Sequence, residues 1–177
     1  MVLRYFVFFI YFTVLPGFTY AQVDEMTMKA IFIERFSRFI EWPADRQGDF
    51  FRIQVLGDKK LAQKFRKIYK KLEVKNKTVL IHEHGKVYNA NFRPHVVYIT
   101  DKKLISPVLK TTEKKPVLIV SEVPGGAREG AMINIYKKES TLKFEINERS
   151  MYNSNLYVSY RLKKAAQHIV DPVREKK

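Results

Sequence analysis

The residues from Arg38 to Pro43 combine side chains that could contact a partner or a small ligand. Arg38 and Glu41 carry opposite charges, and Trp42, the only tryptophan of the chain, offers a large flat ring for stacking. A purely structural interpretation is also open. Arg38 and Glu41 are three residues apart and could simply pair on a helix surface, while Trp42 could seal the edge of the core.

The glycine cluster from Pro124 to Gly130, PGGAREG, is the second candidate site. Gly125 and Gly126 would let the backbone approach an anion, and Arg128 could bind a phosphate or carboxylate through two parallel hydrogen bonds. The segment precedes a predicted strand and lacks the known nucleotide-binding motifs, so a flexible connection is the competing interpretation. Its position after an apolar strand, where open α/β sheets form binding crevices, still favours a contact with a small anionic ligand or a partner.

Buried amides and histidines supply the remaining polar candidates. Asn134 and Asn147 lie in apolar stretches, where an amide needs hydrogen-bond partners, so we expect structural roles, with Asn134 holding the glycine cluster. His82 and His84 would share one face of a strand and could bind a metal with His95. Nothing in the sequence completes such a ligand set, and we predict no metal site.

Residue types that perform catalysis do not gather in this sequence. The absence of cysteine excludes thiolate chemistry, Cys-ligated zinc and disulfides. The serines are scattered without a nucleophile motif, and no pair of carboxylates has a useful spacing. We therefore predict no catalytic residues, no bound cofactor and no enzymatic activity.

The periodicity of apolar residues predicts the elements that must position these side chains. Helices are expected at residues 23–42, 59–72, 102–114 and 150–170. Strands are expected at residues 50–58, 78–84, 95–101 and 115–123, followed by a hairpin of 131–138 and 141–149. The pattern indicates a layered α/β sandwich with a mixed sheet of about six strands and helices on both faces. The third and fourth strands are apolar throughout, which is typical of central strands.

The first predicted helix would end at the Arg38–Pro43 candidate site. Asp24 is expected to cap its N-terminus, and Pro43 is expected to end it just after Trp42. Glu34 and Arg38 are expected to face solvent, opposite the apolar stripe.

The first 21 residues have the layout of a secretory signal peptide. A positive charge at Arg4 precedes an apolar run, and small residues, Thr19 and Ala21, precede the expected cleavage site. A membrane anchor or a buried helix is the alternative, although the run is shorter than the about 20 residues that span a bilayer. We expect residues 22–170 to form one exported domain and residues 171–177 to form a basic tail.

Positive charge dominates the chain, with 33 Lys and Arg against 18 Asp and Glu. Much of the excess lies in residues 59–77 and in the tail. Such a surface could meet an anionic membrane, a polysaccharide or nucleic acid, or it could be a solvated helix face, which we prefer. Nucleic acid is the least favoured partner because the chain is expected to be exported.

Four segments together resemble the YfiR-like family of bacterial periplasmic proteins. They are KAIFIERFSRFIEWP (29–43), FRIQVLGD (51–58), PHVVYITD (94–101) leading to PVLIVSE (116–122), and GAMINIYKKESTLKFEIN (130–147). The resemblance implies a periplasmic α/β regulator that binds the periplasmic part of a membrane signalling protein, either a diguanylate cyclase, which it represses, or a sensor kinase. Well-studied members form disulfides, so the redox control proposed for them could not operate in this cysteine-free chain.

Exposed aromatic residues would anchor such a partner. Tyr152, Tyr157 and Tyr160 in the last predicted helix are the first candidates, and they could equally support a homodimer. A different class of function stays open, a periplasmic module that binds a small anionic solute at residues 124–130.

Overall fold

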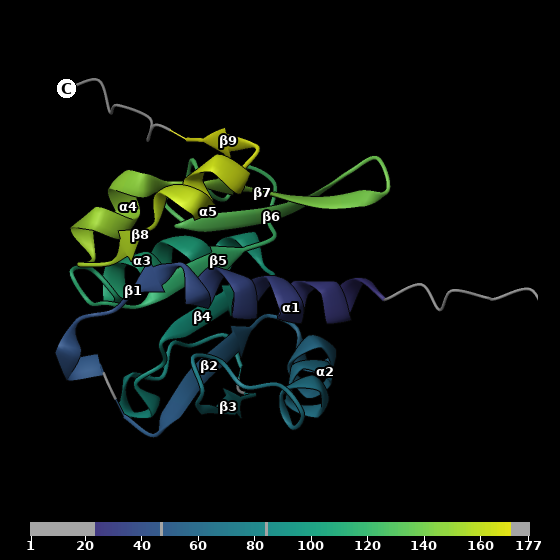
Figure 1. The fold of residues 1–177 in the computed structure, drawn as a ribbon, viewed down its shortest axis with the longest axis vertical. Coiled ribbons are helices and arrows are strands. Elements are labelled where there is room, and N and C mark those ends of the chain that lie inside the picture. Colours follow the sequence, from purple (N-terminus) through teal and green to yellow (C-terminus); the bar gives the residue numbers. More distant parts are fainter. Residues whose placement is uncertain (1–23, 47, 84, 171–177) are drawn as a thin grey trace, which may run out of the picture.

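A seven-stranded mixed sheet forms the centre of the computed structural model, which describes residues 24–46, 48–83 and 85–170 (Figure 1). Neighbouring strands are parallel from the first to the fifth, the sixth is antiparallel to the fifth, and the seventh is parallel to the sixth. In spatial order the strands are β3 (Thr78–His82), β2 (Phe50–Leu56), β4 (Val96–Ile99), β5 (Leu118–Ser121), β6 (Ile133–Lys138), β7 (Thr141–Ile146) and β9 (His168–Ile169).

This architecture confirms the predicted α/β sandwich. Every residue of β4 and β5 is buried, as expected for central strands covered on both faces. The hairpin of β6 and β7 is also confirmed, and its turn includes Glu139 with a positive φ of 56°. The sheet has one strand more than the predicted number of about six, because β9 lies where we expected a helix.

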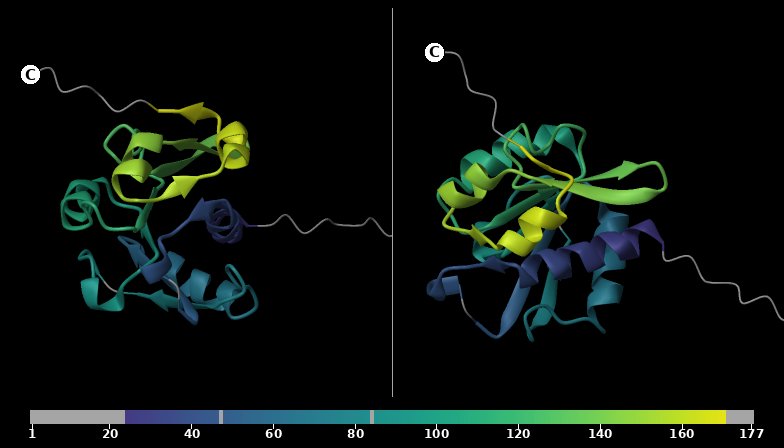
Figure 2. Two further views of the ribbon diagram at one scale, coloured as in Figure 1. Left: turned by 60° about the vertical axis from the view of Figure 1, so that its left-hand side comes forward. Right: turned by 45° about the horizontal axis from the view of Figure 1, so that its top comes forward.

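Helices cover the two faces of the sheet in separate groups (Figure 2). Phe36 of α1 (Glu25–Arg38) packs on Phe144 of β7, and Phe65 of α2 (Lys59–Tyr69) packs on Tyr98 of β4. The 3-10 turn Lys102–Leu104 and helix α3 (Ile105–Thr111) lie on the opposite face. Pro107 does not interrupt α3, because it lies in the first turn, where its missing N–H is not needed.

Helix α1 begins as predicted but ends earlier. Asp24 caps it, with Oδ1 accepting a hydrogen bond from the Thr27 amide at 3.1 Å. The helix stops at Arg38, and Ile40–Glu41 form strand β1, so the prediction of a helix through Trp42 is wrong. The reason is tertiary pairing: β1 is antiparallel to β8 (Tyr157–Val158), and the Phe39 carbonyl accepts from the Ser159 amide at 2.9 Å.

The last predicted helix, 150–170, is also wrong. The segment contains α4 (Glu148–Asn153), β8, α5 (Tyr160–Ala165) and β9. Asn155 has a left-handed φ of 54°, which ends the turn after α4, and the Ser159 hydroxyl caps α5 by accepting from the Leu162 amide at 3.3 Å. The remaining short 3-10 turns are Ala44–Arg46 and Ala90–Phe92.

The two ends of the chain leave some predictions open. The predicted signal peptide, residues 1–21, and the basic tail, residues 171–177, lie outside the described residues. Within the described residues, none of the helices has both the length and the apolar character that crossing a bilayer requires.

Candidate interaction surface

The small sheet of β1 and β8 brings two of the predicted groups together. Glu41 is paired with Tyr157 and Ile40 with Val158 in the antiparallel register. Tyr160 follows as the first residue of α5, and Arg38 is the last residue of α1. Arg38, Glu41, Tyr157 and Tyr160 therefore lie around the C-terminal end of α1, and we call them the tyrosine surface.

The two tyrosines of this surface are turned toward solvent. Tyr157 is 58% exposed and Tyr160 is 74% exposed, as is Tyr152 in α4 at 69%. Beneath them, Ile40 and Leu156 are buried, so the backbone that carries the rings is fixed by the core. Large aromatic side chains that stay exposed on fixed backbone lose little conformational entropy on binding, which is the property of an interface anchor.

Arg38 pairs with Glu34 rather than with Glu41. Its Nε donates to Oε1 of Glu34, one helical turn earlier. Glu34 is only 5% exposed, so the prediction that it faces solvent is wrong. A carboxylate this buried needs a compensating charge, and Arg38 supplies it while its own side chain stays 64% exposed. The ion pair with the buried Glu34 therefore fixes the position of the Arg38 guanidinium on the tyrosine surface.

Trp42 packs at the edge of the core, as the structural interpretation predicts. The half-buried indole meets the ring of Phe51 edge-on at 5.6 Å, and the ammonium of Lys75 lies 5.6 Å from the indole centroid. The indole Nε1 is buried and has no hydrogen-bond partner among the described residues. Its ligand-binding role stays a prediction.

His95 lies behind Trp42 and is held neutral. Its ring stacks on Phe51, Nδ1 accepts from the Arg52 amide at 3.0 Å, and Nε2 lies 2.9 Å from the Arg46 carbonyl. This pair of contacts requires the proton on Nε2. Burial lowers the pKa of His95 to about 4, and the positive charges of Arg46 and Arg52 act in the same direction, although the bond to the Arg46 carbonyl opposes them.

The structure describes two of the three histidines that were weighed as metal ligands, His82 and His95. His82 ends β3 and His95 precedes β4, and these two strands lie on either side of β2, which separates the two residues in the sheet. Both ring nitrogens of His95 contact backbone groups, and His82 Nε2 lies 3.2 Å from Asn89 Nδ2. Residue 84 lies outside the described residues. No metal-binding group of three or more His, Asp or Glu side chains occurs in the part of the chain that the structure describes.

The glycine cluster lies on the other face of the sheet from α1. Asn134 Nδ2 donates to Glu145 Oε1 at 3.2 Å. Glu145 follows Phe144, which faces α1, and successive strand residues point to opposite faces. Gly126 rests against this far face, since a Cβ on it would lie 2.7 Å from Asn134 Oδ1. The sheet thus separates Gly125, Gly126, Arg128 and Asn134 from the tyrosine surface.

Closed turns, rather than an open loop, make up the glycine cluster. The amides of Arg128 and Gly130 donate to the carbonyls of Gly125 and Ala127 at 3.0 and 3.1 Å, and the Ala131 amide donates to the Gly126 carbonyl at 3.0 Å. These groups are therefore not available to cradle an anion. Arg128 remains exposed, and its anion-binding role stays a prediction.

Asn147 fastens the cluster more directly than Asn134 does. Its Nδ2 donates to the Ala127 carbonyl at 2.8 Å, while its Oδ1 caps α4 by accepting from the Ser150 amide at 2.9 Å. The predicted structural role of Asn147 is confirmed. Asn134 contacts the cluster without hydrogen-bonding to it, because its Oδ1 has no partner among the described residues.

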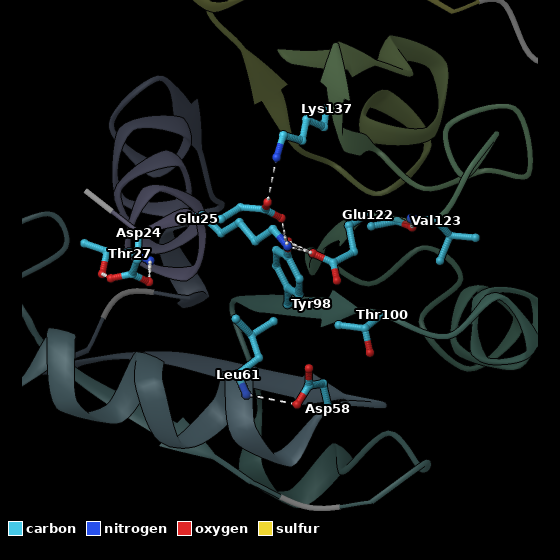
Figure 3. A network of polar contacts seen from close by, with 12 residues as sticks. Asp24, Glu25, Thr27, Asp58, Leu61, Tyr98, Thr100, Glu122, Val123 and Lys137 are labelled. Carbon is cyan, nitrogen blue, oxygen red and sulfur yellow. Dashed lines mark hydrogen bonds and ion pairs between the residues drawn. The ribbon is translucent and has the colours of Figure 1, made fainter. Parts of the chain in front are cut away.

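A partly buried charge network links α1 to the sheet, and sequence reasoning did not find it (Figure 3). Lys29 Nζ lies 2.7 Å from Glu122 and 2.8 Å from Glu25, and the Tyr98 hydroxyl donates to Glu122 at 2.7 Å. Burial pulls the pKa of Lys29 down, but the bonds to Glu122 and Glu25 outweigh it and raise the pKa. The charges are mutually compensated, so the network fixes the helix. Its members are too far apart in sequence to form a motif.

Comparison with known proteins identifies the family. Residues 26–167 match the profile of the YfiR/HmsC-like family. The curated proteins gave no match to this chain. The matched region runs from the first turn of α1 to the residue before β9, and so covers well over half of the chain and nearly all of the described fold. This chain therefore belongs to the YfiR/HmsC-like family.

Proposed function

We propose that this protein is an exported regulator that binds the periplasmic part of a membrane signalling protein and thereby sets its output. Membership in a family of periplasmic regulators supports the class of function. The observation that carries the assignment to a surface is the pairing of β1 with β8, which places the exposed Tyr157 beside Glu41 and next to Arg38 and Tyr160.

The chemistry of the tyrosine surface suits protein recognition better than catalysis. Two exposed phenol rings flanked by one cation and one carboxylate provide apolar contact area together with polar groups that can set orientation. A diguanylate cyclase that is held inactive is the partner that family precedent favours, and a sensor kinase is the second. Because Glu34 and the core fix the surface, binding would require little rearrangement of this protein.

Site-specific photo-crosslinking tests this function. A photoreactive phenylalanine analogue would be placed at position 157 and, as a control, at Val87, which is 76% exposed and lies outside the tyrosine surface. In membranes of the source cells, we expect position 157 to capture a transmembrane signalling protein and position 87 not to capture it. The purified periplasmic part of that protein should then bind about 100-fold more weakly to a Tyr157→Ser, Tyr160→Ser double variant, as loss of two anchors implies.

Two results would count against the proposal. One is capture of the same proteins from positions 157 and 87. The other is equal affinity of the double variant and the unaltered protein for the captured partner, with both proteins folded by circular dichroism.

A further inference from the structure

An apolar groove lies beside the tyrosine surface, between α1, β7 and α5. Its volume is about 460 Å³. Three rings form its floor, those of Phe32, Phe36 and Phe144, with centroids 4.8 to 6.1 Å apart. Phe36 and Phe144 are buried, but Phe32 is only partly buried, as are Phe39 and Leu142 on the walls. Part of the aromatic side-chain surface in this groove is therefore exposed to solvent.

The charges around this groove are all of one sign. Arg35 and Lys143 are its ionisable lining residues, and none of its lining residues is a carboxylate. Lys143 precedes Phe144 on β7, so its side chain points to the opposite face of the sheet, and Arg35 is the cation that faces the groove. Within the described part of the chain, neither Arg35 nor Lys143 forms an ion pair, although carboxylates pair with other lysines and arginines on the same helix, such as Lys29 and Arg38. The groove thus combines an apolar floor and apolar walls with one cation, Arg35, that forms no ion pair within the described residues.

We propose that this groove binds a free amphiphilic anion, a carboxylate with an apolar tail. The tail would lie over the rings of Phe32, Phe36 and Phe144, and the carboxylate would meet Arg35. Three properties support this ligand class. The volume is in the usual range for small-molecule sites, the lining is mainly apolar with few polar groups, and the charge at the wall complements an anion.

The groove shares its walls with the proposed partner surface. Phe39 lines the groove, and its carbonyl accepts the hydrogen bond from Ser159 that follows β8. Helix α5, which begins at Tyr160, contributes Leu162 and Ala166 to the lining. A ligand in the groove would contact the same two helices that carry the tyrosine surface. The binding site itself stands independently of the proposed function.

Calorimetric titration with three amphiphiles of one tail length tests the head group. The probes are dodecanoate, dodecan-1-ol and dodecyltrimethylammonium, each used below the concentration at which it forms aggregates, with the purified protein at neutral pH. We expect one dodecanoate per chain, bound at least tenfold more tightly than the alcohol and more tightly still than the cation, since one charge-assisted contact is worth about tenfold in affinity. No binding of dodecanoate, or equal affinity for all three probes, would overturn the proposal.

Variants of the lining then locate the site. Arg35→Gln should weaken dodecanoate binding about tenfold or more and leave the binding of the alcohol unchanged. Ala166→Trp, at a partly exposed position, should fill the groove and abolish binding of every probe. The matched control is Lys110→Gln on α3, which removes an exposed cation outside the groove. Binding that survives Ala166→Trp, or that Lys110→Gln weakens as much as Arg35→Gln does, would show that the anion binds elsewhere.

Discussion

At the scale of single residues, close packing and buried charge determine which substitutions and which changes of pH the fold tolerates. The buried oxygens of Ser121 and Asn134 meet Gly126, Glu34 is compensated by Arg38, and His95 is held between backbone groups. The local sequence does not reveal these contacts. Gly126 and His95 meet groups on other elements, and the helical pattern does not show that Glu34 is buried and needs Arg38 as its partner. Two of them give measurable expectations.

Gly126→Ala should destabilise the fold. The added Cβ would lie 2.7 Å from both Asn134 Oδ1 and Ser121 Oγ, and these two side chains are almost fully buried and cannot withdraw to solvent. We expect a loss of about 1–3 kcal/mol in the free energy of unfolding, measured by urea denaturation. Gly48→Ala is the control, since no atom lies within 4 Å of its Cβ position. Equal stability of the two variants would contradict the packing described for the cluster.

His95 should make the stability fall in mild acid. The pKa of its ring is about 4 in the folded protein against an ordinary value of 6.5, so the unfolded chain takes up the proton first. The free energy of unfolding should therefore decrease as the pH falls from about 7 to about 4 and should lose no more through this residue below that, a total of about 3 kcal/mol. Denaturation curves of the wild type and His95→Gln would be compared across this range, and NMR titration would report the ring directly. A wild type and variant with parallel pH profiles would refute this assignment.

At the scale of elements, two-residue strands determine where the candidate surface forms. β1 and β8 are too short to show alternation of apolar and polar residues, and each pairs with a partner distant in sequence. The sequence pattern therefore predicted continuous helices there, while it correctly placed β4, β5 and the β6–β7 hairpin, whose signals are local. The exposure of Tyr157 and Tyr160 was foreseen, but their meeting with Arg38 and Glu41 depends on this pairing.

Ser159 offers a matched pair of variants for the small sheet. Ser159→Ala removes the hydroxyl that caps α5, whereas Ser159→Pro also removes the N–H that donates to the Phe39 carbonyl. Proline fits the backbone, because φ of Ser159 is −66°. We expect the alanine variant to cost about 1 kcal/mol of stability and the proline variant about 1 kcal/mol more. Hydrogen exchange at Tyr157 and Val158 should accelerate in the proline variant alone, and equal exchange in both variants would contradict the role of this bond.

At the scale of the whole molecule, the parallel strands of the sheet provide stability, whereas the tyrosine surface and the apolar groove lie on elements outside them. The strand order β3-β2-β4-β5-β6 is a doubly wound arrangement whose central strands β4 and β5 are buried on both faces. Packing must supply its stability, since the chain has no cysteine. The lysine-rich α2 confirms the predicted helix with one apolar face, since Leu61 and Phe65 are buried and Lys60 and Lys67 are exposed, although it ends at Tyr69 rather than at residue 72. The tyrosine surface and the apolar groove both lie toward the C-terminal end of α1, where late elements of the chain complete the fold.

Helix α1 takes part in almost every arrangement of this molecule. Its 14 residues supply Lys29 to the network with Glu122, Phe36 to the core and Phe32 to the groove. They also supply the ion pair between the buried Glu34 and the exposed Arg38. A substitution in this helix would rarely alter one property alone, so the helix should be slow to diverge. Changes of specificity, whether they arise in nature or by engineering, should occur more readily in β8 and α5. Their exposed side chains take part in fewer contacts, so one of them can change without altering the rest of the fold.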